Sequence, residues 1–462
     1  MAAVQRVKKI FTPHIITPVL FGLIFILILL RCLFTLDPDF GWHISSGQYI
    51  LANGLPQTDI YTYTAADFPW IHHEWLADVI NAAMFNLGGI PLLAVFFTAL
   101  WTLAIWLMAG KQNWKGAVVV LIAVIAMAQF VAIRDTAYTA LLLAIAHRLY
   151  DKARVYIPLL FIVWANLHGG FMIGFAYILW RVLYERRWQE IWIAVVAFAA
   201  TLINPYGPNL YREIFATLLD PTLHTKINEW QRMGINATLI ILPIVWLVPI
   251  VHDLYKNKWR GIVQFDVYLL LASLLSLRHF MLFSLFSLPR ITAFYSQLSL
   301  PKWRPPKKVF ALKRIFAALG IQIAGLSLLT LFIASCVTAL QGPLQFAPEE
   351  SQPVTAVKSL QNAACKGNIF NDYDIGGYLI WKYPEQKIYI DGRMPSWHYN
   401  GTNYMADYLK ITQNDDFQKQ HFNTHHITCA IVKNDSRLAT SLKKLGWRSE
   451  VDYNSGWTLL RK

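Results

Sequence analysis

Long apolar runs separated by short polar stretches fill the first three quarters of the chain. Most of these runs are long enough, or nearly long enough, to cross a bilayer as helices. They lie near residues 15–30, 90–109, 117–133, 136–150, 156–166, 170–184, 191–202, 239–251, 262–277, 281–294 and 315–340. The pattern predicts an all-α polytopic membrane bundle of about eleven spans.

The composition leads to the same class of protein. Hydrophobic residues make up 56% of the chain and charged residues 15%, which is too apolar for a surface that faces water throughout. The formal net charge is +14, but Lys and Arg lie in short clusters between apolar runs and not along one continuous face. We therefore expect membrane lipids as partners and no nucleic acid.

The basic clusters predict the orientation in the membrane. No small-residue cleavage site follows the first apolar run, so we expect a retained anchor with a cytoplasmic N-terminus. Counting spans from there puts the clusters at 111–115, 152–154, 186–187, 256–260 and 301–314 on the cytoplasmic side. The prediction is a multi-pass protein of the plasma (inner) membrane.

From about residue 345 the chain becomes polar and changes its periodicity. Strands are expected at 367–370, 386–393, 427–433 and 456–462, and helices at 401–411 and 436–446. We predict a transmembrane domain at 1–344 and a small extracytoplasmic α/β domain at 345–462. Cys365 and Cys429 fall in the second domain, where they either form a disulfide or lie buried as small apolar residues.

Unusual polar residues gather on the predicted outer side. The count of spans places there a large first outer loop, residues 37–87, and several polar residues at the ends of later runs: Arg134, Asn166, His168, Asn204, Glu229, Arg278 and His279. Each such residue costs about 2 to 3 kcal/mol at membrane depth, so several on one side indicate a shared solvated cavity. The alternative is a set of separate helix ends that are capped at the interface.

The first outer loop carries a longer motif. It opens with Asp37-Pro38-Asp39-Phe40-Gly41-Trp42-His43 and continues with Gly47, Ile50, Gly54, Pro56, Asp59 and the stretch 70–76, W-I-H-H-E-W-L. Together with W-A-N-L-H-G-G at 164–170, N-P-Y-G at 204–207 and R-H at 278–279, this resembles a bacterial group of the GT-C glycosyltransferases. That group has a second aromatic residue where this chain has Gly41.

The resemblance implies a membrane enzyme that transfers a sugar from a polyprenyl-phosphate donor to an unknown acceptor on the extracytoplasmic face. Asp39 or Asp37 is the expected general base for the acceptor hydroxyl. Substrate contacts are expected from Trp42, His43, His72, His73, Glu74, Arg134, Asn166, His168, Arg278 and His279. Asp37 and Asp39 could instead bind Mg or Mn together with His43, or could simply form a turn and a helix N-cap.

A second, distant resemblance lies in the C-terminal region. The stretch containing Tyr373, Asp374 and Gly376 is similar to the W-W-D-Y-G motif of oligosaccharyltransferase catalytic subunits. It implies acceptor contacts by Tyr373, Asp374, Asp391 and Arg393, while an N-cap role for Asp374 is the alternative. A transporter or lipid flippase, and a non-catalytic scaffold with the same fold, are the competing functions.

Overall fold

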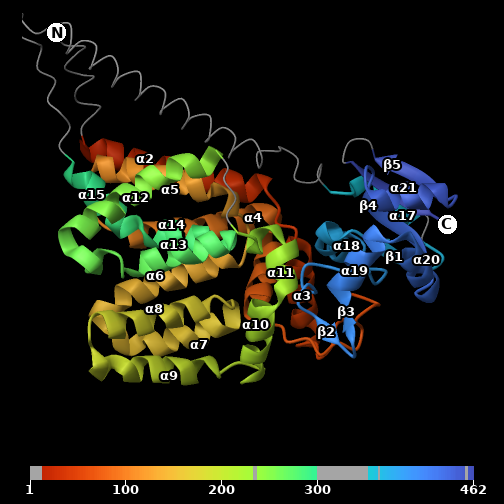
Figure 1. Ribbon diagram of the computed structural model, residues 1–462, viewed down its shortest axis with the longest axis horizontal. Helices are drawn as coiled ribbons and strands as arrows, with labels where there is room; N and C mark the ends of the chain where they lie inside the picture. The colour runs from red at the N-terminus through yellow and green to blue at the C-terminus, as the bar shows by residue number, and fades with distance from the viewer. Residues whose placement is uncertain (1–12, 233–236, 299–351, 363–364, 453–455) are drawn as a thin grey trace, which may run out of the picture. The chain divides into compact units, whose positions relative to one another are not determined.

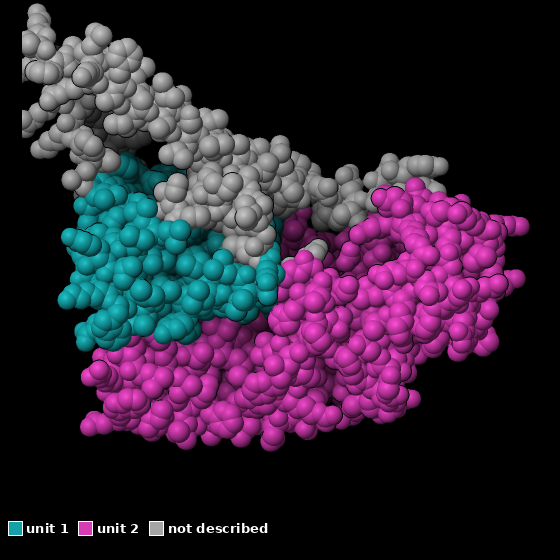
Figure 2. Space-filling model, viewed as in Figure 1, with its two compact units in different colours: residues 1–31, 101–131, 232–344 teal, residues 32–100, 132–231, 345–462 magenta. Residues whose placement is uncertain are grey.

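The computed structural model describes residues 13–232, 237–298, 352–362, 365–452 and 456–462 (Figure 1). The predicted span at 315–340 and the predicted domain boundary at residue 344 lie outside these ranges. The chain divides into two compact units (Figure 2), which are Met1–Arg31, Trp101–Val131 and Arg232–Leu344 for the first, and Cys32–Leu100, Ala132–Gln231 and Gln345–Lys462 for the second. The C-terminal region thus forms one compact unit with the first outer loop.

The first unit is a bundle of apolar helices. Its described elements are α2 (Pro13–Phe34), α5 (Trp114–Met127), η1 (Ala128–Phe130), α12 (Ala237–Asn257), η5 (Lys258–Gly261), α13 (Phe265–Leu275), η6 (Leu277–His279), α14 (Phe280–Phe286) and α15 (Leu288–Gln297). Helix α5 packs against α15, α14 and α12, and α13 packs against α14.

The second unit contains a stack of helices followed by the C-terminal region. Its helices before the C-terminal region are α3 (Phe40–Asn53), α4 (Trp75–Ala109, whose last turns belong to the first unit), α6 (Thr136–Ala153), η2 (Arg154–Tyr156), α7 (Ile157–Leu167), α8 (Phe171–Tyr184), η3 (Trp188–Glu190), α9 (Ile191–Thr201), α10 (Asn209–Leu219), α11 (Pro221–Lys226) and η4 (Asn228–Trp230). Helix α7 packs against α6, α8 and α9, as the stack in Figure 1 shows.

Two described helices are long and apolar enough to cross a membrane, Ile16–Phe34 and Trp75–Ala109. The other apolar helices of the described chain are shorter, so the count of about eleven spans is not confirmed. The last part of the predicted first outer loop, from Trp75 onward, is the beginning of α4. That helix is interrupted at Gly88 and Gly89, whose backbone angles are not helical, and then continues as the predicted second span.

The C-terminal region is a small α/β layer, as predicted. Its elements are α17 (Val354–Asn362), β1 (Asn368–Asn371), η7 (Tyr373–Ile375), α18 (Gly376–Lys382), β2 (His398–Tyr399), β3 (Thr402–Asn403), α19 (Tyr404–Gln413), α20 (Asp415–Thr424), β4 (Ile427–Lys433), α21 (Arg437–Lys444), β5 (Arg448–Asp452) and β6 (Trp457–Arg461). The sheet order is β1-β4-β6-β5, with β1 parallel to β4 and the other pairs antiparallel. The predictions at β1, β4 and β6 are confirmed.

The predicted strand at 386–393 is wrong, because this stretch does not enter the sheet. Its backbone pairs with the first outer loop, where Ile388 N donates to Tyr61 O at 3.0 Å and Tyr63 N donates to Ile388 O at 3.2 Å. The side chain of Asn371 also accepts from Tyr389 N at 2.8 Å. The alternating apolar residues of this stretch therefore pack in a contact between two loops. The same alternation is expected of a strand in a sheet, so the sequence pattern does not distinguish the two cases.

One hydrophobic core joins the first outer loop to the C-terminal region. Trp42, Phe68 and Trp70 of the loop belong to the same cluster of buried side chains as β1, β4 and β6. Helix α3 crosses α18 so closely that a Cβ atom on Gly41 would lie 2.0 Å from the carbonyl oxygen of Gly377. The departure at Gly41 from the bacterial pattern thus has a physical reason, since any side chain there would separate the two helices.

Cys365 and Cys429 form a disulfide in this region, with a sequence separation of 64 residues. Disulfides persist in oxidising compartments, so the bond supports the extracytoplasmic placement that the topology predicts.

The disulfide gives a stability prediction. Replacing both cysteines by Ser is expected to lower the stability of the folded protein by about 4 kcal/mol, because the cross-link removes conformational entropy from the unfolded chain. The measurement is the thermal midpoint in detergent with and without dithiothreitol. Reductant should lower the midpoint of the parent and leave the double variant unchanged, and equal midpoints for the two proteins without reductant would contradict the prediction.

Candidate functional site

The turn that precedes α3 separates the roles of the two aspartates. Asp37 Oδ1 accepts from the backbone N of Asp39 at 2.9 Å, which is the turn contact expected beside Pro38. Asp39 is the N-cap of α3, but its side chain makes no capping hydrogen bond. Its Oδ1 instead accepts from Trp42 Nε1 at 3.0 Å. Asp39 therefore keeps its second carboxylate oxygen for other partners.

His43 lies between two carboxylates from other segments. Its Nδ1 is 2.6 Å from Asp78 Oδ1 and 3.5 Å from Asp135 Oδ2. Asp78 belongs to α4 and Asp135 caps the start of α6, and both side chains are almost completely buried. His72 Nε2 lies 2.8 Å from the other oxygen of Asp78. The His43 ring also stacks on Trp42, with centroids 3.6 Å apart, which fixes its plane.

Glu74 faces two further histidines from the turn before α4. Its Oε1 is 3.4 Å from His168 Nε2 and 3.7 Å from His73 Nε2. The backbone N of Gly170 donates to His168 Nδ1 at 2.9 Å, so that nitrogen carries no proton. The proton of a neutral His168 consequently lies on Nε2 and points toward Glu74.

The pKa values in this cluster move in opposite directions. Burial and then the neighbouring Asp37 raise the pKa of Asp39 to about 6, despite opposing contributions from His43, Trp42 and Arg134. Burial would also raise the pKa of Glu74, but the surrounding histidines outweigh it and lower the value to about 2. Burial lowers the pKa of His43, yet Asp78 and Asp135 raise it well above its ordinary value. The environment thus gives two carboxyl groups of one site very different pKa values, which is typical of acid–base catalysis.

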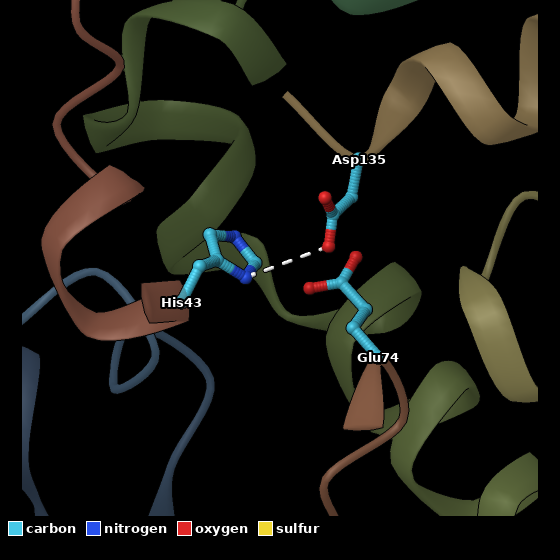
Figure 3. Close-up of side chains that lie close together, drawn as sticks. All are labelled: His43, Glu74 and Asp135. Atoms are coloured by element: carbon cyan, nitrogen blue, oxygen red, sulfur yellow. Dashed lines mark ion pairs between the residues drawn. The ribbon is translucent and has the colours of Figure 1, made fainter. Parts of the chain in front are cut away.

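Three of these side chains converge closely enough to share one metal ion (Figure 3). A nitrogen of His43 and an oxygen from each of Glu74 and Asp135 all lie within 4.8 Å of one another. Asp135 Oδ2 is buried and accepts no hydrogen bond from the described residues, and its charged neighbour is His43 at 3.5 Å. Imidazole with two carboxylates suits Mn, and the carboxylates also suit Mg. The group differs from the predicted one, because Glu74 and Asp135 take the places assigned to Asp37 and Asp39.

Arg134 lies beside this cluster and is held by two carboxylates. Its Nη1 and Nη2 donate to Glu229 at 2.6 and 2.7 Å, and its Nε is 3.1 Å from Asp37 Oδ2. A bidentate guanidinium has the geometry to bind a phosphate, but here it is occupied by Glu229, so the substrate contact expected of Arg134 stays a prediction.

Other predicted residues occupy structural positions. Asn166 accepts from Trp75 Nε1 at 2.9 Å and donates to the carbonyls of Ile162 and Ile203, each at 2.8 Å, so its amide joins three segments. Arg278 and His279 lie in η6 of the first unit, and their contact with a donor stays a prediction.

The four predicted acceptor residues separate into two kinds. Asp391 and Arg393 lie inside the core as an ion pair, with their side chains 0% and 3% exposed. Asp374 is exposed and pairs with Lys433 at 3.1 Å, while Asp372 and not Asp374 caps η7. Burial and then the nearby Asp39 carboxylate raise the pKa of Tyr373. Tyr373 is therefore the member of the motif that is electrostatically coupled to the cluster.

Solved structures match this architecture, although no protein-family model and no curated protein matches the sequence. The oligosaccharyltransferase of Archaeoglobus fulgidus in its apo form is similar with a TM-score of 0.58 and 11% identity, over 92% of this chain and 70% of that one. The archaeal oligosaccharyltransferase AglB of the same organism, in complex with an inhibitory peptide and a dolichol-phosphate, gives 0.59 and 10%, over 96% and 74%. The chain thus has a fold similar to that of these two oligosaccharyltransferase structures.

The prediction of a helical bundle followed by a small α/β region is confirmed, and the fold is similar to that of these two structures along almost the whole chain. The bacterial group whose motif this chain resembles is not tested by these matches. At 10 to 11% identity the similarity establishes the fold only. The chemistry has to be argued from the side chains of the cluster.

The sequence reasoning missed Asp78 and Asp135 as members of the cluster. Asp78 interrupts an apolar helix four residues after Glu74, and Asn81 follows it one turn later. Asn81 Nδ2 donates to Asp135 Oδ1 at 2.7 Å and accepts from Tyr138 at 2.8 Å. Polar residues within an apolar helix cost free energy and therefore indicate a functional or structural network. The sequence shows Asp78 and Asn81 within such a helix.

Proposed function

We propose that the chain is a membrane glycosyltransferase that transfers a sugar from a polyprenyl-phosphate donor to an acceptor hydroxyl or amide. The observation that carries the proposal is the cluster itself, in which Asp39, His43, Glu74, Asp135 and His168 come together from four separate segments. The fold supports it, because a similar oligosaccharyltransferase is known in complex with a dolichol-phosphate and an inhibitory peptide.

The reaction that fits the cluster is a direct displacement. Asp39 takes the proton of the acceptor as its oxygen or nitrogen attacks the anomeric carbon, and the bond from that carbon to the phosphate oxygen breaks. The proton ends on the Asp39 carboxylate, and the electron pair of the broken bond leaves with the lipid phosphate. A base with a pKa of about 6 is mostly ionised at neutral pH and still accepts a proton in the transition state.

A divalent cation would be held by His43, Glu74 and Asp135, and its charge would stabilise the leaving phosphate. The low pKa of Glu74 fits this assignment, because that carboxylate stays anionic. Burial raises the pKa of Asp135 well above its ordinary value, and a bound cation would favour its ionised form. Asp78 lies 2.6 Å from His43 Nδ1 and also pairs with His72, so these two residues fix the orientation of the His43 ring. Mg or Mn is the proposed ion.

The test of this proposal is transfer from radiolabelled polyprenyl-phosphate hexoses, supplied one at a time to membranes that contain the protein. Glu74→Gln is expected to lower the release of polyprenyl phosphate at least 10-fold, because the cluster loses an anionic ligand while a side chain of the same size is kept. A chelator should lower the parent rate, and added Mn or Mg should restore it.

Glu385→Gln is the matched control, since Glu385 is an exposed residue of the same unit and its replacement should leave the rate unchanged. The metal assignment is wrong if Glu74→Gln and chelation both leave transfer intact. The glycosyltransferase proposal is itself in doubt if the parent releases no lipid phosphate from any of the donors.

A further inference from the structure

A glycine of the C-terminal region lies directly against the Asp39 carboxyl group. A Cβ atom built on Gly392 would lie 1.8 Å from Asp39 Oδ1, 2.9 Å from Asp39 Cγ and 3.4 Å from Asp39 Oδ2. These are its three nearest neighbours outside the adjoining residues, so the space that a side chain needs at this position is filled by one carboxyl group. Gly392 is not among the glycines with positive φ, so its backbone accepts alanine without strain.

The turn that carries Gly392 has no freedom to retreat. Arg393 Nε and Nη2 donate to Asp391 at 2.8 and 2.7 Å, and Nη2 also lies 2.8 Å from Asp59 Oδ1 in the first outer loop. The guanidinium is stacked between aromatic rings, with Trp70 at 4.4 Å and Tyr61 at 4.9 Å. The turn is therefore fixed by buried charges and rings on both sides of the glycine.

The other side of the contact is fixed equally well. The close crossing of Gly41 and Gly377 sets α3 against α18, and Asp39 is the residue that begins α3. Trp42 Nε1 holds one oxygen of Asp39 from within the same helix. Two rigid elements thus meet at the carboxyl group, and neither of them belongs to the apolar helix stack.

We propose that Gly392 is a positioning residue for Asp39, so that the C-terminal region supplies one wall of the catalytic centre. This inference rests on the proposed role of Asp39 as the general base. Because residue 392 has no side chain, the Asp39 carboxylate can keep the orientation in which it accepts the Trp42 hydrogen bond. The motif at 391–393 then acts on the base and does not need to contact the acceptor.

The substitution Gly392→Ala separates positioning from folding. The added methyl group meets the end of a flexible side chain and no backbone atom among its three nearest neighbours, so the carboxylate can rotate away while the turn stays in place. We expect kcat to fall about 10-fold to 100-fold, because a displacement of the base of about 1 Å costs this much in rate. KM for the donor should stay within about twofold, since the proposed phosphate contact is the cation site and not Gly392, and the thermal midpoint should fall by only about 2 °C.

A cycle with Asp39→Ala tests the contact itself. Removing the carboxylate leaves room for the methyl group, so Gly392→Ala should no longer lower the thermal midpoint in the Asp39→Ala background, nor lower the residual kcat further. Gly22→Ala is the matched control, because a Cβ on that exposed glycine of α2 meets nothing within 4 Å and should change neither quantity.

The outcomes are distinct. A parental kcat in Gly392→Ala overturns the proposal, and so does a loss of activity that is accompanied by a collapse of the thermal midpoint. If Asp39→Ala transfers sugar at the parent rate, the role of Asp39 as base fails, and the thermal cycle still decides whether the two residues are coupled. Equal midpoint shifts in both backgrounds would then remove the contact as well.

Discussion

Replacing Asp39 by Asn is expected to lower the rate of sugar transfer about 100-fold to 10,000-fold, which is the usual effect of losing a general base. The amide has the shape of the carboxylate and still accepts the Trp42 hydrogen bond, but it cannot take a proton at neutral pH. The fold should be preserved, so expression and the thermal midpoint are expected to change little. Turnover of a radiolabelled polyprenyl-phosphate sugar in membranes is the measurement.

Asp37→Asn is the matched comparison for this prediction. Asp37 accepts a turn amide and pairs with Arg134, so its loss is expected to cost about 1 kcal/mol of stability and much less rate than the loss of Asp39. The base is wrongly assigned if Asp39→Asn works at the parent rate. Full activity in both variants would show that neither aspartate of this loop takes part in the reaction.

The same assignment predicts a pH dependence. A base works only when it is ionised, and burial together with Asp37 raises the pKa of Asp39 to about 6. The rate should therefore increase as the pH rises through about 6 and level off above it. The residual activity of Asp39→Asn should lack this increase, because the amide does not titrate.

Replacing Arg393 by Met is expected to cost about 3 to 5 kcal/mol of stability, because it leaves two carboxylates buried without their cation. The side chains of Asp59 and Asp391 are both 0% exposed, and the guanidinium lies within 2.8 Å of each of them. The thermal midpoint in detergent reports the loss. Adding Asp59→Asn and Asp391→Asn should recover part of it, since the uncompensated charges are then gone.

Arg437→Met is the control for this prediction. Arg437 also pairs with an aspartate, Asp415, but the two side chains are 53% and 60% exposed. Such exposed pairs contribute about 1 kcal/mol or less. A small and similar shift of the thermal midpoint for both arginine variants would show that Arg393 does not fix the turn at 391–393.

The sequence was sufficient for the class of fold and for part of the candidate site. Spans of apolar residues and the change in periodicity near residue 345 predicted a helical bundle followed by an α/β region, which the structure has. The loop motif led to Asp39, His43 and Glu74, which lie in the cluster. The fold could be predicted because periodicity is encoded by neighbouring residues, and the roles of the three site residues stay predictions.

The parts that the sequence did not reveal depend on contacts between distant segments. Nothing near Asp135 in the sequence shows that it lies beside His43, and the stretch 386–393 alternates like a strand although its partner is the loop that contains Tyr61. The sequence shows only that Gly41 stands where the bacterial group has an aromatic residue. In the structure, α18 fills the space that a side chain at residue 41 would need. Long-range packing decides such cases, and a local pattern does not record it.

The core that joins Trp42, Phe68 and Trp70 to the C-terminal strands has a consequence for biosynthesis. A ribosome makes the first outer loop hundreds of residues before it makes β6 (Trp457–Arg461), so these aromatic side chains have no packing partners until that strand has been made. The candidate site, which Gly392 borders, cannot be completed in a nascent chain that ends before the C-terminal region. Premature termination would therefore yield a product that exposes apolar rings to chaperones and proteases.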